Sequence, residues 1–124
     1  MRCENGMLEL NHKNRDFWKV GIKFVIFIYE ITEKFPKSEL YGITNQIRRA
    51  AVSIPSNLAE GSSRRSPAER RRFFEIARSS LVELDTQIEI AIRLGYVSDE
   101  MNSKLDKMTN HLFALLSNLI KNTN

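Results

Sequence analysis

Apolar residues recur along the chain at intervals of three and four, which is the spacing of one face of an α-helix, and they nowhere alternate as they do in a half-buried strand. Four segments show this helical period, and they run from about Phe17 to Lys34, Ser38 to Glu60, Ser66 to Gly95, and Ser98 to Leu119. Each segment carries one main apolar stripe. The pattern therefore predicts an all-α fold, an up-and-down antiparallel four-helix bundle with short connections.

The apolar stripes predict which residues lie in the core. In the first two segments they are Phe17, Val20, Phe24, Phe27 and Ile31, followed by Leu40, Ile43, Ile47, Ala51, Ile54 and Leu58. In the last two they are Phe74, Ala77, Leu81, Leu84, Ile88 and Ala91, followed by Met101, Leu105, Met108, Leu112, Leu115 and Leu119. The last stripe alternates strictly between steps of four and three, which is typical of the seam in a left-handed bundle.

Local signals predict where the helices begin, bend and end. Phe35-Pro36 ends the first helix, and Gly61 and Gly95 supply stops for the second and third. The run Ser66-Pro67-Ala68-Glu69 is a capping box with proline at the first helical position, so it marks a helix start. Pro55 is expected to kink the second helix because it has no N–H to donate.

A chain of 124 residues and 14.4 kDa fits one domain. We expect a single bundle domain over residues 15–124, preceded by a flexible N-terminal arm over residues 1–14. Cys3 is the one cysteine, so it can form no internal disulfide, and the first ten residues lack the apolar core of a secretory signal. The dense apolar stretch Phe24 to Ile31 is shorter than the roughly 20 residues that span a membrane. A cytoplasmic location is expected.

The residue types that carry catalysis or bind metals do not occur at productive spacings. His12 and His111 are far apart, no pair of His or Cys has metal-ligand spacing, and Cys3 has no visible base partner. Ser62 and Ser63 follow a glycine, but no strand precedes them and the P-loop lysine is missing. We therefore expect a non-enzymatic protein without cofactor, metal or catalytic residue.

Positive charge is concentrated in the middle of the chain. Residues 41–80 contain eight Arg, no Lys and three Glu, a net charge of +5 against +4 for the whole protein. Five of these residues form what we call the arginine cluster: Arg64, Arg65, Arg70, Arg71 and Arg72. Arginine near a helix N-terminus opposes the macrodipole unless an anion completes the site, and guanidinium groups bind phosphate in a planar, bidentate manner. The cluster predicts contacts to RNA or DNA; the alternative is a solvated face whose arginines pair with Glu60, Glu69 or Glu75.

The first helix is apolar around most of its circumference. The three other helices of a bundle can cover only part of this apolar surface. Its second apolar side and part of the second helix form what we call the assembly face: Trp18, Ile22, Val25, Ile26, Tyr29, Arg49 and Val52. We expect a second subunit to cover it, with Arg49 available for an intersubunit ion pair. The alternative is that these residues pack under the N-terminal arm or a loop.

The segment from Phe35 to Gly61, FPKSELYGITNQIRRAAVSIPSNLAEG, resembles the signature of the 23S ribosomal RNA intervening-sequence proteins, a bacterial family. A looser match extends from Trp18 to the turn Leu94-Gly95-Tyr96. The resemblance implies a small cytoplasmic bundle, without catalytic residues, that assembles as a ring, a pentamer in some relatives. The chain is also similar to accessory proteins of diversity-generating retroelements, which bind nucleic acid and a reverse transcriptase.

Together these observations predict a homo-oligomer that acts as a nucleic-acid-binding accessory protein through its arginine cluster. The alternative is a protein-binding scaffold or adaptor with no nucleic-acid role, in which the outer apolar surfaces receive a protein partner and the arginines serve solubility and subunit pairing.

Overall fold

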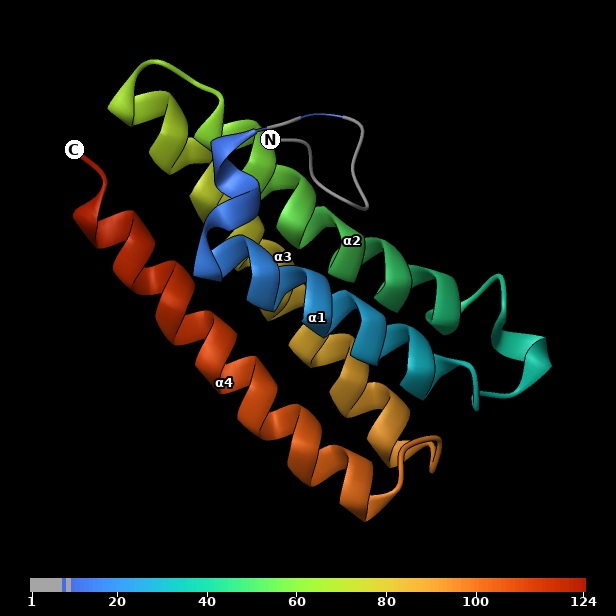
Figure 1. Cartoon of the computed structure of the whole chain (residues 1–124). Helices are drawn as coiled ribbons and strands as arrows, with labels where there is room; N and C mark the ends of the chain where they lie inside the picture. Colours follow the sequence, from blue (N-terminus) through green and yellow to red (C-terminus); the bar gives the residue numbers. More distant parts are fainter. Residues whose placement is uncertain (1–7, 9) are drawn as a thin grey trace.

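The computed structural model describes residue 8 and residues 10–124, and this part of the chain is all helical, without strands (Figure 1). Its elements are η1 (Asn11–Asn14), α1 (Asp16–Thr32), η2 (Lys37–Glu39), α2 (Ile43–Ser62), α3 (Pro67–Arg93) and α4 (Asp99–Asn122), where η denotes a single 3₁₀ turn. Successive α-helices run in opposite directions, and both α1 and α3 pack against α2 and α4. The predicted all-α, up-and-down four-helix bundle is confirmed.

The core lies along the axis of the bundle and draws on all four helices. Its fully buried large side chains are Phe24, Ile28, Ile47, Ile54, Leu58, Leu81, Leu84, Leu112 and Leu116. Every residue of the predicted α3 stripe is buried. In α4 the predicted stripe was wrong at one position: it placed Leu115 in the core, but Leu116 is fully buried and Leu115 is only half-buried. A helix with 3.6 residues per turn drifts away from a 3.5-residue repeat, so the buried position moves by one residue toward the end of α4.

The second helix begins later than predicted. Residues 37–39 form the single turn η2, and α2 starts only at Ile43. The N–H of Gly42 donates to the carbonyl of Glu39 (2.9 Å), and the hydroxyl of Tyr96 donates to the Glu39 carboxylate (2.9 Å). Leu40 is consequently 46 % exposed, and its predicted place in the core was wrong. Tyr96 lies in the connection between α3 and α4, 57 positions from Glu39, so no local pattern indicates this contact.

The start of α3 and its end follow the local signals, whereas the predicted stop at Gly61 was wrong, because Gly61 lies buried inside α2, which ends at Ser62. The hydroxyl oxygen of Ser66 accepts a hydrogen bond from the N–H of Glu69 (3.3 Å), as expected of an N-cap. Gly95 adopts a φ of +81° directly after α3, a conformation that is unstrained only for glycine. The helix α2 continues through Pro55 as far as Ser62.

The predicted N-terminal arm is described only in part. Residues 1–7 and 9, with Cys3 among them, lie outside the described residues. The turn η1 contacts α1 and α2, and His12 within it is only 8 % exposed, with its ring packed edge-on against Trp18 at 5.3 Å between centroids. Among the described residues, no helix has the length and apolar content needed to cross a membrane.

Candidate functional site

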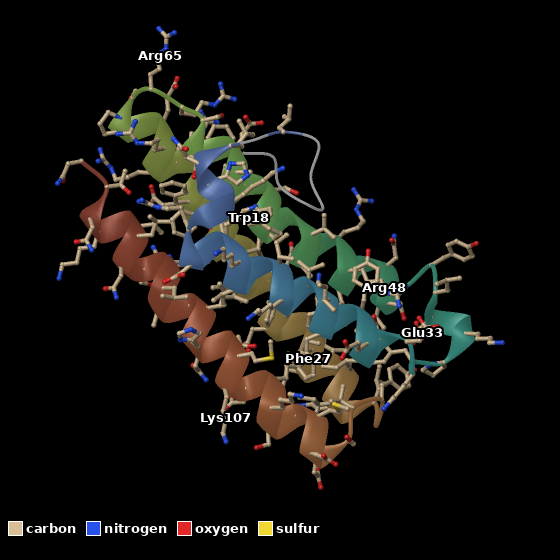
Figure 2. The ribbon with its side chains drawn as sticks, in the orientation of Figure 1. Trp18, Phe27, Glu33, Arg48, Arg65 and Lys107 are labelled. Atoms are coloured by element: carbon tan, nitrogen blue, oxygen red, sulfur yellow. The ribbon has the colours of Figure 1, made fainter. Side chains whose placement is uncertain are left out.

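The arginine cluster lies at one end of the bundle, where the α2–α3 connection, the start of α1 and the last turn of α4 come together (Figure 1). Arg64 and Arg65 belong to the connection, and the other three arginines to the first two turns of α3. Figure 2 shows Arg65 at the tip of this end, pointing away from the helices. The short connection is what brings residues 64–65 and 70–72 onto the same end of the molecule.

Arg70 ties the α2–α3 connection to the body of the bundle. Its Nη1 donates to the carbonyls of Arg64 (3.1 Å) and Arg65 (2.6 Å), and its Nη2 donates to the main-chain oxygen of Asn124 (3.4 Å). Its side chain is half-buried. The sequence predicted either phosphate contact or an ion pair with a nearby glutamate for Arg70; its hydrogen bonds to main-chain oxygens give it a structural function that neither interpretation included.

Two further members of the cluster also make contacts within the chain. Arg71 Nη1 donates to the carbonyl of Thr123 (2.7 Å), which fixes the end of α4 against α3. Arg64 Nη2 lies 3.3 Å from the Glu60 carboxylate, and its guanidinium stacks over the ring of Phe73 at 4.9 Å. The ion pair with Glu60 is one of the pairings expected under the solvated-face alternative.

Arg65 and Arg72 are exposed and form no hydrogen bond or ion pair through their side chains with any described residue. Within this part of the chain, three of the five guanidinium groups, those of Arg65, Arg71 and Arg72, therefore have no carboxylate partner, since Arg71 donates to the neutral carbonyl of Thr123. Arg70 also contacts the main-chain carboxyl oxygen of Asn124, the last residue. A bond to a carbonyl leaves the charge of the guanidinium in place. This end of the bundle consequently carries positive charge at Arg65, Arg71 and Arg72 that can attract an anion.

A cavity of about 410 Å³ opens at the same end and adds an arginine that the sequence analysis did not single out. Arg15, directly before α1, lines it together with Arg70. The two residues are far apart in sequence, and no local pattern links them. Only the packing of the helices, which brings the ring of Phe17 to 6.1 Å from that of Phe74 between centroids, places them at the same cavity.

The assembly face is continuous in the structure. A cavity of about 350 Å³ between α1 and α2 is lined by five of its members, namely Trp18, Ile22, Val25, Ile26 and Val52. A neighbouring cavity is lined by its remaining members, namely Tyr29 and Arg49, again together with Val52. Ile26 is 54 % and Val52 41 % exposed. The structure therefore brings all seven residues to one surface over α1 and α2.

The turn η1 borders the assembly face. Part of this face therefore packs under the N-terminal segment, as the alternative prediction had it. His12 lines the α1–α2 cavity and contacts Trp18, which is half-buried. Burial, and secondarily the charge of Lys13, hold the pKa of His12 below its usual 6.5. The imidazole is therefore neutral at pH 7, as an apolar contact with Trp18 requires.

Arg48, which precedes the exposed Arg49 of the assembly face, is held by contacts with α1 and the residue that follows it. Its Nε donates to the hydroxyl of Thr32 (2.8 Å), its Nη2 lies 3.4 Å from the Glu33 carboxylate, and its guanidinium stacks over Tyr29 at 4.5 Å (Figure 2). These contacts join α2 to the end of α1. They also hold the Tyr29 ring in place at the edge of the assembly face.

The described residues contain no group of three or more His, Cys, Asp or Glu side chains that could hold a metal ion.

No curated protein shows a significant match to the chain. Among solved structures, the chain is similar to a crystal structure from Bacteroides thetaiotaomicron, described as a protein with unknown function from the S23 ribosomal protein family. The two share 22 % sequence identity with a TM-score of 0.78, over 85 % of this chain and 98 % of the other, which shows a common fold. The model of the 23S rRNA-intervening sequence protein family matches residues 13–118, and the chain belongs to this family.

Proposed function

We propose that this protein is a non-enzymatic, homo-oligomeric accessory protein that binds RNA or DNA through its arginine cluster. One observation carries the proposal: within the described residues, three of the five guanidinium groups, those of Arg65, Arg71 and Arg72, have no carboxylate partner. Positive charge concentrated on one end and left without partners is the electrostatic footprint of phosphate binding.

The arrangement favours contact with the phosphate backbone over base recognition. The exposed arginines Arg65 and Arg72 lie on a connection and in the first turns of a helix, with no adjacent element shaped to enter a groove. Phosphate contacts position a protein on nucleic acid but carry no sequence information. We expect weak sequence selectivity and, for about four neutralised phosphates on a single strand, a slope of log K against log salt near −3.

The test is fluorescence anisotropy with a structured RNA and a duplex DNA over a series of salt concentrations. In a single-strand arm, the double variant Arg65→Ser/Arg72→Ser should bind more weakly, with a slope less negative by about 1.4, because two phosphate contacts are lost. The matched control, Lys37→Ser/Lys107→Ser, also removes two exposed charges but away from the cluster. Equal effects of the two double variants, or no binding by the wild type at low salt, would refute the proposal.

Self-association is supported by the assembly face. Ile26 and Val52 leave large exposed apolar surface beside an apolar cavity between α1 and α2, and a helix that is apolar beyond its core stripe favours an additional packing partner. A closed ring, as in relatives of the family, would bring several arginine clusters into one assembly and so multiply their attraction for a polyanion.

Native mass spectrometry tests the assembly. Ile26→Glu/Val52→Glu should reduce the assembly to monomers, while Val82→Glu, at a side chain 53 % exposed on α3, should leave the mass of the assembly unchanged. Equal assembly masses in all three proteins would contradict the role of the assembly face. A monomeric wild type without nucleic-acid affinity would favour the second candidate, a scaffold that receives a protein partner on the same apolar face.

A further inference from the structure

The turn η1 forms one wall of the apolar cavity between α1 and α2. His12, the second residue of this turn, lines that cavity together with Trp18, the largest side chain of the assembly face. The two rings pack edge to face, with 5.3 Å between their centroids and 70° between their planes. His12 is buried and forms no ion pair with a described residue. Its imidazole is therefore packed as an apolar ring.

The charged groups around His12 oppose its protonation. Lys13 is its neighbour in η1, and the cavity at the arginine end, which His12 also lines, receives Arg15 from the start of α1 and Arg70 from α3. From the end of α4, this cavity receives Asn124, whose main-chain oxygen is bonded to Arg70 (3.4 Å). The helices α1 and α2 contribute only uncharged side chains to both cavities. No Asp or Glu side chain lines either cavity, so an imidazolium here has no carboxylate side chain to pair with.

A neighbouring subunit on the assembly face would cover the cavity that His12 lines. The part of the imidazole that still contacts water would then lose that contact. Burying an unpaired charge costs far more free energy than burying a neutral ring. Protonation of His12 and binding of a neighbour therefore oppose each other, and by linkage each weakens the other.

We propose that His12 makes the self-association of this protein sensitive to acid: the neutral imidazole completes a wall of the assembly face, and the imidazolium weakens the contact with a neighbouring subunit. The inference rests on the proposed function and names a regulation of its assembly face. Between about pH 7.5 and about pH 5, histidine is the side chain that ordinarily changes its charge. The other histidine, His111, is exposed on α4 and lines neither cavity of the assembly face.

The direction of the effect follows from the environment of His12. Burial, and secondarily Lys13, lower the pKa of His12 below its usual 6.5, so the neutral form is the one that the fold favours. Assembly should therefore be strongest above pH 6.5 and weaken as the pH falls below 6.5. One proton taken up for each interface that dissociates changes the association constant by at most about tenfold per pH unit.

The experiment is sedimentation velocity over a dilution series of the full chain, at about pH 7.5 and about pH 5 and at one salt concentration. It measures the protein concentration at which half of the assembly has dissociated. For the wild type, this concentration should be about three- to tenfold higher at the lower pH. His12→Leu and His12→Gln carry no charge on this side chain at either pH, so both should lose the difference.

The second histidine supplies the matched control. His111→Leu should keep the full difference between the two pH values, because the exposed imidazole of His111 can be protonated without leaving water. Circular dichroism of each protein at both pH values shows that the compared samples retain the helical fold.

Each contrary result overturns a different part of the reasoning. Equal dissociation of the wild type at both pH values would refute the acid sensitivity and leave the proposed self-association standing. A pH difference that persists in both His12 variants, or that disappears in His111→Leu, would assign the effect to another group and refute the role of His12. A wild type that is monomeric at both pH values and at every concentration would refute the inference together with the proposed self-association.

Discussion

Replacing Arg70 with serine tests whether the arginine cluster also holds the fold together. Arg70 makes two close hydrogen bonds, to the carbonyls of Arg64 (3.1 Å) and Arg65 (2.6 Å), and a longer one to Asn124 (3.4 Å). Hydrogen bonds to charged groups contribute about 1.5 to 3 kcal/mol where water is excluded and less where it has access. Because Arg70 is half-buried but its three hydrogen bonds are exposed to water, we expect Arg70→Ser to lower the free energy of unfolding by about 1 kcal/mol.

The measurement is urea unfolding followed by circular dichroism at 222 nm, at one fixed protein concentration because self-association shifts apparent stability. Arg65→Ser is the control: its side chain is exposed and unbonded to described residues, so its free energy of unfolding should stay within about 0.5 kcal/mol of the wild type. If both variants unfold at the same urea concentration, the structural role assigned to Arg70 is wrong. A triple replacement of residues 70–72 would mix stability with binding, which is why single variants are preferable.

Two further predictions concern packing and pH. A Cβ on Gly61 would lie 2.7 Å from the buried ring of Phe74, so Gly61→Ala should destabilise the fold by about 1 kcal/mol or more in thermal unfolding, against a gain in helix propensity. At Gly21 the nearest atom would be 3.6 Å away, so Gly21→Ala should stabilise by up to about 1 kcal/mol; the same sign for both variants would contradict the packing. The pKa of His12 is lowered in the folded state, so its docking is stable above pH 6.5 and weakens as the pH falls below 6.5 toward the lowered value. Fluorescence of Trp18, the only tryptophan, should report a transition below pH 6.5 that disappears in His12→Leu; a pH-independent signal in the wild type would contradict this.

Much of the fold could be predicted because its signals are local. The α3 stripe, the cap at Ser66 and the stop at Gly95 each depend on residues within a turn or two of one another, and all three are as predicted. The failures have a tertiary origin. The turn that delays α2 is held by Tyr96 from the connection between α3 and α4, and the burial of Leu116 in place of Leu115 depends on how α4 lies against its neighbours.

The candidate site divides in the same way. The gathering of arginines near the start of the third helix and the second apolar side of the first helix could both be predicted, because both are patterns of neighbouring residues. Which arginines make contacts within the chain could not be predicted, since it depends on helix packing: Arg70 reaches a main-chain oxygen 54 positions away, while Arg65 and Arg72 remain exposed. Helix packing also places Arg15 beside the cavity that Arg70 lines. The physical reason is that periodicity and capping act over a few residues, whereas contacts between the ends of different helices exist only once the bundle has packed.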